Sequence, residues 1–197
     1  FYTKALKINP NLPDVKNNMD HALEENSEIE KLAFDYSKMT EQELESPEVI
    51  HFIGSLFAAR NYTETAIDKY KQALNMEPDY AEAYNSLGIA FKNKNDLNNA
   101  IENYKKAISF KLDYAEAFNN TANALRAKGD LKAAIKNYKK ALKIKPEFIA
   151  IYNNLGSTLA DIGDLDGAID SEQQALKIKP DSFESYTNMG IAWLLKG

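Results

Sequence analysis

Apolar and small residues recur along most of the chain at an interval of 34 residues. The stretch 81–114 carries two apolar stripes separated by a polar turn, and its pattern returns at 115–148 and at 149–182. Within each unit the apolar positions are three, four or seven residues apart, which places their side chains on one face of a helix. The pattern therefore predicts pairs of amphipathic helices repeated along the chain, rather than one globular core.

The first helix of each unit combines large residues with a recurring glycine. When each unit is numbered from its first residue, position 4 is mainly aromatic, position 8 is mainly glycine and position 11 is aromatic or leucine. A glycine inside a helix costs about 1 kcal/mol relative to alanine, so a closely crossing neighbour helix is the expected reason for it. The residues taken from this pattern as core are Gly88, Phe91, Tyr152, Gly156, Tyr186 and Trp193.

The second helix of each unit places an aromatic residue between alanines. Alanine stands at positions 20 and 27, and position 24 is Tyr70, Tyr104 or Tyr138, with Glu172 as the exception. A large ring flanked by alanines at helical spacing is suited to packing against a close neighbour. The three tyrosines are therefore predicted to belong to the repeat core.

This combination of residues resembles the tetratricopeptide repeat, a helix-turn-helix unit of the same length. The prolines that the family carries at position 32 are present as Pro78, Pro146 and Pro180, whereas Leu112 takes that place in the unit 81–114. The motif YNNLG, which begins at Tyr152, is most similar to the arrays that precede the catalytic region of O-GlcNAc-transferase-type proteins, and to many bacterial repeat proteins. The resemblance implies an all-α fold, a right-handed α-solenoid (superhelix) of antiparallel helix-turn-helix units.

The repeat numbering divides the chain into seven segments. Residues 1–12 fit the end of a second helix from a truncated repeat, and 183–197 fit the first helix of a further truncated one. Residues 13–46 keep the spacing but lack several pattern residues, which indicates a degenerate, helical unit. The complete units are 47–80, 81–114, 115–148 and 149–182.

Acidic residues concentrate in and just after the degenerate unit. From Glu24 to Glu48 the chain carries nine acids and two lysines, although the net charge of the whole chain is only −5. This segment is either a solvated surface or a contact for a basic partner.

The composition excludes several kinds of site and partner. Cysteine is absent, which excludes disulfides and thiolate metal sites. No apolar run approaches the roughly 18 residues of a membrane span, and no signal segment opens the chain, so a cytoplasmic location without membrane contact is expected. The second helices carry repeated lysines, but a pI near 5.2 and the acids between them argue against nucleic acid as a partner.

Candidate binding residues lie on the side of the first helices that the core pattern leaves unused. In the family this side lines the concave surface, and here it is unusually rich in asparagine, a poor helix former. The residues predicted to bind a ligand are Asn85, Lys92, Asn119, Asn120, Asn123, Arg126, Asn153, Asn154, Ser157 and Asn188.

A row of carboxamides suits an extended peptide, because each amide both donates and accepts hydrogen bonds. The resemblance implies such an asparagine row in O-GlcNAc-transferase-type arrays. The alternative is that these asparagines only solvate the face or bond within it. Family members that clamp a C-terminal carboxylate use Lys and Arg, whereas Glu82 and Glu116 stand at one of those positions here and would repel it.

Catalytic and metal chemistry find little support in the sequence. His21 and His51 have no Ser, Asp or Cys at a spacing that suggests a triad, and no phosphate-binding glycine loop occurs. The acids between Asp161 and Asp166 depart from the spacing of an EF-hand loop. No enzyme activity, catalytic residue, metal or cofactor is therefore predicted.

The predicted function is a protein-protein interaction scaffold that holds an extended peptide or protein segment in the concave groove. One alternative is the substrate-recruiting arm of a larger glycosyl-, methyl- or sulfotransferase. Another is head-to-tail self-association, in which the unpaired helix at 183–197 packs on the unpaired helix at 1–8 of another copy.

Overall fold

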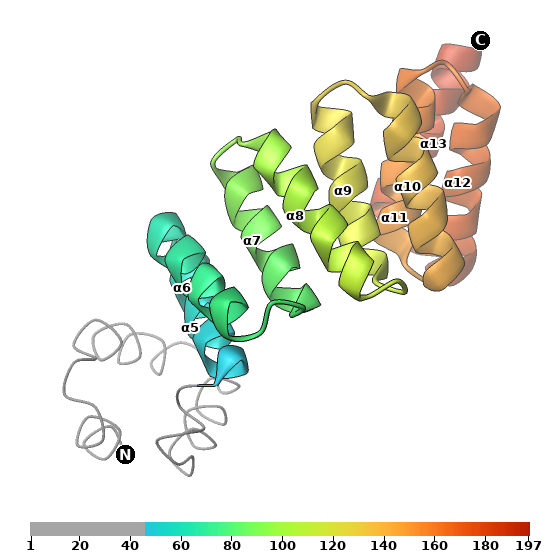
Figure 1. The fold of residues 1–197 in the computed structure, drawn as a ribbon. Helices are drawn as coiled ribbons and strands as arrows, with labels where there is room; N and C mark the ends of the chain where they lie inside the picture. Colours follow the sequence, from blue (N-terminus) through green and yellow to red (C-terminus); the bar gives the residue numbers. More distant parts are fainter. Residues whose placement is uncertain (1–45) are drawn as a thin grey trace. The chain divides into compact units, whose positions relative to one another are not determined.

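A computed structural model describes residues 46–197, and every regular element in this part of the chain is an α-helix (Figure 1). None of these helices is long and apolar enough to cross a membrane. The helices are α5 (Pro47–Ala59), α6 (Thr63–Met76), α7 (Ala81–Asn93), α8 (Leu97–Phe110), α9 (Ala115–Ala127), α10 (Leu131–Ile144), α11 (Ile149–Asp161), α12 (Leu165–Ile178) and α13 (Phe183–Lys196).

The chain divides into two compact units, Phe1–Ala90 and Phe91–Gly197, and the division falls within α7. In the first unit α5 packs on α6, and polar side chains join α5 to the start of α7. The second unit contains α8 to α13. The predicted segment 1–12, most of the predicted unit 13–46 and most of the acidic stretch 24–48 lie outside the described residues.

Each described first helix begins at the residue that the pattern numbers as position 1, and it ends in a left-handed turn residue. Gly129 and Gly163 have φ angles of 85° and 81°, as the sequence predicts for a helix end. Asn61 and Asn95 take the same place with φ angles of 63° and 60°. Asparagine tolerates this conformation better than most other residues with a side chain, so the same turn forms without glycine.

Aspartates then start most of the second helices. The carboxylates of Asp96, Asp130 and Asp164 each accept a hydrogen bond from the backbone N–H three residues further on. Such an N-cap satisfies one of the otherwise unpaired donors in the first helical turn. In the repeats that begin at residues 81, 115 and 149, the turn glycine or asparagine and the following aspartate therefore fix where the helix pair folds back.

Within a repeat the two helices approach closely at the position 8 glycine. A Cβ atom added to Gly54 would lie 2.8 Å from Cε1 of Tyr70 on α6. A Cβ atom added to Gly156 would lie 2.5 Å from Oε1 of Glu172 on α12. The close helix crossing that the recurring glycine predicts is therefore present, with the position 24 side chain filling the space left by the missing Cβ atom.

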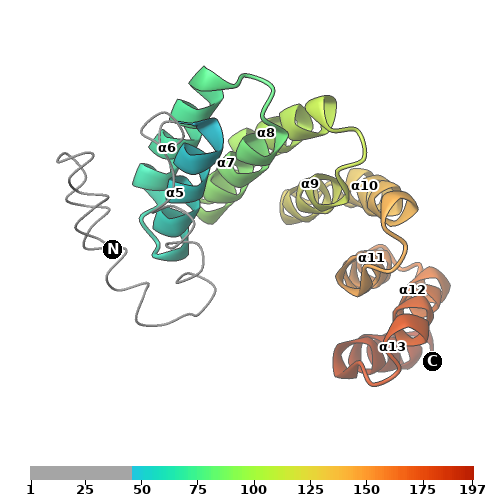
Figure 2. The same cartoon turned by 90° about the horizontal axis from the view of Figure 1, so that it is seen from below.

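The second unit arranges its helices in two layers. Figure 2 shows α9, α11 and α13 along one side, and α10 and α12 along the other. First helices contact one another, α9 with α11 and α11 with α13, while α10 packs against both α9 and α11. An apolar core runs between the layers and includes Phe118, Tyr138, Ile151, Leu155 and Leu159.

Most of the predicted core residues are enclosed. Tyr70, Tyr104 and Tyr138 are at most 3% exposed, Gly88 and Gly156 are buried, and Phe91 and Tyr152 are half-buried.

Tyr186 and Trp193 differ from the core prediction, since they are 53% and 54% exposed. Both lie on α13, which packs on α11 and α12 and buries Ser185 and Ala192, the residues directly before them in the chain. No described helix covers the side of α13 that corresponds to the covered faces of the other first helices. The pattern therefore identifies an apolar face on α13, and its prediction that Tyr186 and Trp193 belong to the core is wrong.

Two tyrosine substitutions compare a buried hydroxyl that is hydrogen-bonded with one that is not. The hydroxyl of Tyr138 donates to Asn123, whereas that of Tyr104 has no partner among the described residues. Tyr138→Phe is therefore expected to lower the free energy of unfolding by about 1 kcal/mol, and Tyr104→Phe to leave it unchanged or raise it. Urea unfolding followed by circular dichroism measures both, and an equal loss in the two variants would contradict the assignment.

Candidate functional site

Polar side chains join neighbouring first helices at a constant sequence separation. His51 bonds to Ser86, Asn154 to Asn119, and Arg126 to Asp161, and the two residues of each pair are 35 apart. Because the repeat is 34 residues long, each pair joins one position to the next position in the following repeat. The packing of adjacent first helices thus brings these side chains together.

The central pair lies between α9 and α11. Nδ2 of Asn154 donates to Oδ1 of Asn119 over 3.3 Å, and both side chains are half-buried. A carboxamide has two N–H donors and a carbonyl oxygen with two acceptor positions. This single bond therefore leaves Asn154 with its carbonyl oxygen and one N–H group, and leaves Asn119 with two N–H groups.

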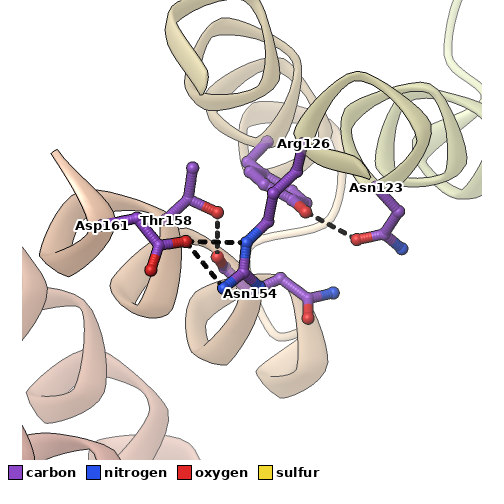
Figure 3. A network of polar contacts seen from close by, with 6 residues as sticks. Asn123, Arg126, Asn154, Thr158 and Asp161 are labelled. Carbon is purple, nitrogen blue, oxygen red and sulfur yellow. Dashed lines mark hydrogen bonds and ion pairs between the residues drawn. The ribbon is translucent and has the colours of Figure 1, made fainter. Parts of the chain in front are cut away.

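An ion pair follows along the same two helices. Nε and Nη2 of Arg126 both donate to Oδ2 of Asp161, over 3.0 and 2.8 Å, and Figure 3 shows the guanidinium pointing toward that carboxylate. The two side chains remain 35% and 45% exposed. An exposed pair of this kind contributes at most about 1 kcal/mol to stability, so both groups remain available for exchange with a charged ligand.

Figure 3 shows Thr158 and Asn123 on either side of Arg126. Oδ1 of Asn123 accepts a 2.5 Å hydrogen bond from the Tyr138 hydroxyl, and the Thr158 hydroxyl donates to the backbone carbonyl of Asn154. The network thus extends from the buried ring of α10 to the partly exposed side chains of α9 and α11. We call Asn119, Asn123, Arg126, Asn154, Thr158 and Asp161 the α9–α11 polar face.

Two predicted binding residues are buried instead of lining a surface. Asn85 and Asn153 are 7% and 3% exposed, and Oδ1 of Asn153 accepts a 2.9 Å hydrogen bond from the Ser185 hydroxyl on α13. Asn153 stands at position 5 of the first helix, on the side of α11 that packs against α13. Helical spacing placed this position opposite the repeat core, but the contact between successive first helices covers part of that side.

The remaining predicted residues fall into different environments. Asn120 and Ser157 are half-buried on α9 and α11, and Lys92 is exposed on α7. Nδ2 of Asn188 donates to Glu172 on α12, over 3.1 Å, so it takes part in the contact between α12 and α13. The structure therefore brings together Asn119, Asn123, Arg126 and Asn154, and it separates Asn85, Asn153 and Asn188 from them.

Asp161 and Thr158 are the residues of this face that the sequence does not assign to binding. The neighbouring acids Asp164 and Asp166 have other partners. Asp164 caps α12, and Asp166 pairs with Lys196 of α13. Among residues 46–197 no three His, Asp or Glu side chains gather as a metal site would require. The separation of 35 residues is the signal that would have linked Asp161 to Arg126.

His51 forms a second polar centre, in the first unit. Its Nε2 lies 2.9 Å from the Ser86 hydroxyl and its Nδ1 lies 3.2 Å from the Tyr80 hydroxyl. The sequence offers no serine at a spacing typical of a triad, yet the repeat brings Ser86 to the imidazole. Burial lowers the pKa of His51, an effect that the nearby charge of Glu82 partly offsets. The neutral imidazole therefore joins α5 to the start of α7.

Two family models match most of the described chain. A model described as the TPR repeat matches residues 54–95 and 122–163, and one described as the tetratricopeptide repeat matches residues 81–114 and 149–182. No curated protein matches the sequence.

Several solved structures share the arrangement of helices. A crystal structure of MamA protein is 27% identical in sequence, with a TM-score of 0.71, and the match covers 78% of this chain and 84% of that one. YrrB, described as a TPR protein with an unusual peptide-binding site, is 21% identical, with a TM-score of 0.67 and coverage of 79% and 80%. PilF of Pseudomonas aeruginosa is 20% identical, with a TM-score of 0.70 and coverage of 76% and 68%.

The buried imidazole gives a prediction for the dependence of stability on pH. The folded state holds the pKa of His51 below its ordinary value of 6.5, so the unfolded chain binds a proton more readily. The contribution of His51 to the free energy of unfolding is therefore expected to be constant above pH 6.5 and to fall as the pH drops from 6.5 toward the pKa of the folded state.

NMR titration of the imidazole signals measures this pKa, with His21→Gln removing the only other histidine. His51→Gln should abolish the corresponding change in stability. A midpoint for His51 above 6.5 would contradict the prediction.

Proposed function

Because this chain belongs to the tetratricopeptide repeat family, whose members act in general as protein-protein interaction scaffolds, we propose that it binds an extended peptide or protein segment. The proposed site is the α9–α11 polar face, together with Asn120 and Ser157. The observation that carries the proposal is the pair Asn119–Asn154, whose single mutual bond leaves amide groups unused on two adjacent repeats.

An extended ligand presents backbone N–H and C=O groups that match those amide groups. The N–H groups of Asn119 and Asn154 would donate to peptide carbonyls, and the carbonyl oxygen of Asn154 would accept from a peptide N–H. Such contacts hold the backbone with little dependence on the ligand's side chains. Their location on two consecutive first helices would place successive contacts along one ligand segment.

The ion pair at the end of this face would add selectivity. Arg126 uses two of its five N–H donors on one oxygen of Asp161, so Oδ1 of Asp161 and the other donors of Arg126 remain for a ligand. A ligand carboxylate would compete for Arg126 and a ligand lysine or arginine would pair with Asp161. The net charge of this pair is zero, which favours a ligand without a large net charge.

Self-association is a second candidate function, and the surface of α13 is the observation that favours it. Phe183, Leu194 and Leu195 are 84%, 83% and 62% exposed, next to the exposed Tyr186 and Trp193. Apolar surface concentrated on one helix is typical of a protein contact. The segment 1–8, which the sequence suggests as its partner in a second copy, lies outside the described residues.

The binding proposal is tested by selecting peptides from a random display library on the full chain. The double variant Asn120→Ala, Asn154→Ala is expected to bind a selected peptide with at least tenfold lower affinity. Isothermal titration calorimetry measures this affinity. Its free energy of unfolding should stay within about 1 kcal/mol of the original, because neither side chain is fully buried.

The matched control is Asn137→Ala on α10, which removes a half-buried asparagine bonded to the backbone of its own helix. This variant should bind the peptide as the original chain does. Unchanged affinity in the double variant would place the ligand elsewhere, and a large loss of stability would assign the asparagines a structural role.

Self-association is expected to appear as a sedimentation coefficient that rises with protein concentration. Leu194→Gln on α13 should reduce that rise by removing exposed apolar surface, whereas Ile178→Gln on α12, a less exposed isoleucine, should not. A sedimentation coefficient that is independent of concentration would exclude the second candidate.

A further inference from the structure

The second unit encloses a carboxyl group that the proposed binding face does not use. Glu172 of α12 is 1% exposed and stands at position 24, where the other complete repeats carry a tyrosine. Its carboxyl group fills the space beside Gly156 of α11, as the Tyr70 ring fills the space beside Gly54. A carboxyl group therefore occupies a place that the fold elsewhere gives to an aromatic ring.

The hydrogen bonds of this carboxyl group are incomplete. Oε1 accepts one hydrogen bond from Nδ2 of Asn188 on α13, over 3.1 Å. Oε2 is buried and has no partner among the described residues. An ionised carboxylate in such a place has lost its hydration and lacks the bonds that would replace it, which makes the charged form costly.

The surrounding charges do not compensate for burial. From α13 the facing charged group is Glu184, which has the same sign, and from α11 the facing residue is the uncharged Gly156. No ion pair of the described residues involves Glu172. Burial raises the pKa of Glu172 to about 7, the hydrogen bond from Asn188 opposes this rise, and Glu184 adds to it.

Helix α13 covers this carboxyl group. Few of its own apolar side chains are buried against the second unit. Its buried side chains are Ser185 and Ala192, while its large apolar residues are mostly exposed. By contrast α11 buries Ile151, Leu155 and Leu159. Because α13 gains little from apolar burial, the charge state of the group beneath it has a large relative effect on its packing.

We propose that Glu172 acts as a proton-dependent latch for α13: the neutral carboxyl group lets α13 pack on α12, and its ionisation releases α13 from that contact. Release would hydrate the carboxylate, and it would also free Asn188 and the apolar residues beside it. The packing of α13 is thereby coupled to pH, independently of whether the α9–α11 polar face binds a peptide.

The direction of the effect follows from proton linkage. An exposed glutamate has an ordinary pKa of 4.5, and the packed state raises that of Glu172 to about 7. The packed state therefore binds the proton more tightly, and its advantage is complete below pH 4.5. This advantage is lost as the pH rises through about 7, so α13 is held in mildly acidic solution and released in mildly alkaline solution.

The only tryptophan of the chain reports on this helix, because Trp193 lies on α13. Its fluorescence and its quenching by acrylamide are measured on the full chain between pH 4.5 and 8.5, at two protein concentrations to exclude self-association. The original chain is expected to show one transition centred near pH 7. Glu172→Gln should lose the transition, because the amide keeps the size of the carboxyl group and does not ionise.

Two further variants should move the midpoint in opposite directions. Glu184→Gln removes the like charge and should shift it to lower pH, while Asn188→Ala removes a bond to the charged form and should shift it to higher pH. Asp170→Asn, which changes an exposed acid on the same helix, is the matched control and should leave the midpoint unchanged. His21→Gln with His51→Gln removes the histidines that titrate in the same range.

A flat fluorescence curve in the original chain would overturn the proposal, and so would a transition that persists in Glu172→Gln. If Glu172→Gln fails to fold, carboxyl ¹³C NMR of the original chain decides the matter. A midpoint near 7 for Glu172, with matching changes in the amide signals of α13, would support the latch. A midpoint near 4.5, or amide signals of α13 that do not change with that titration, would exclude it.

Discussion

The close contact between the two helices of each repeat determines the rest of this structure. A side chain at position 24 of the second helix fits against a glycine or alanine of the first, where a larger residue would collide, as Gly54 shows against Tyr70. The turn between the two helices fixes where the chain reverses, and in three repeats an aspartate cap adds to it. Each repeat then presents the same pair of outer faces, on which the next repeat packs.

Polar pairs add to the apolar contacts between repeats. Buried rings and alanines hold the helix pairs together, whereas Asn119–Asn154 and Arg126–Asp161 join consecutive first helices. Hydrogen bonds between partly exposed groups contribute little net stability, so these contacts align the repeats more than they stabilise them. The same side chains keep unused donors and acceptors, and for this reason we propose the α9–α11 polar face as the site of binding.

The final repeat contact departs from this arrangement in two linked ways. Glu172 replaces the tyrosine of position 24, and α13 rests on it through small and polar residues while its apolar residues are exposed. A ring would have filled the same space without any dependence on protonation. The carboxyl group provides a weaker contact whose strength varies with pH, at the helix that also carries the largest exposed apolar residues.

The sequence alone determined the helices, their turns and the residues between the layers, because helical spacing, capping residues and glycine act over a few neighbouring positions. It also placed Asn119, Asn123, Arg126 and Asn154 among ten candidate binding residues, but it did not separate these four from the others. Only the tertiary structure decided that Asn85 and Asn153 are buried, that Asp161 joins Arg126, and that Tyr186 and Trp193 are exposed. These outcomes depend on which neighbour covers each helix face, and that neighbour lies about one repeat away in the chain.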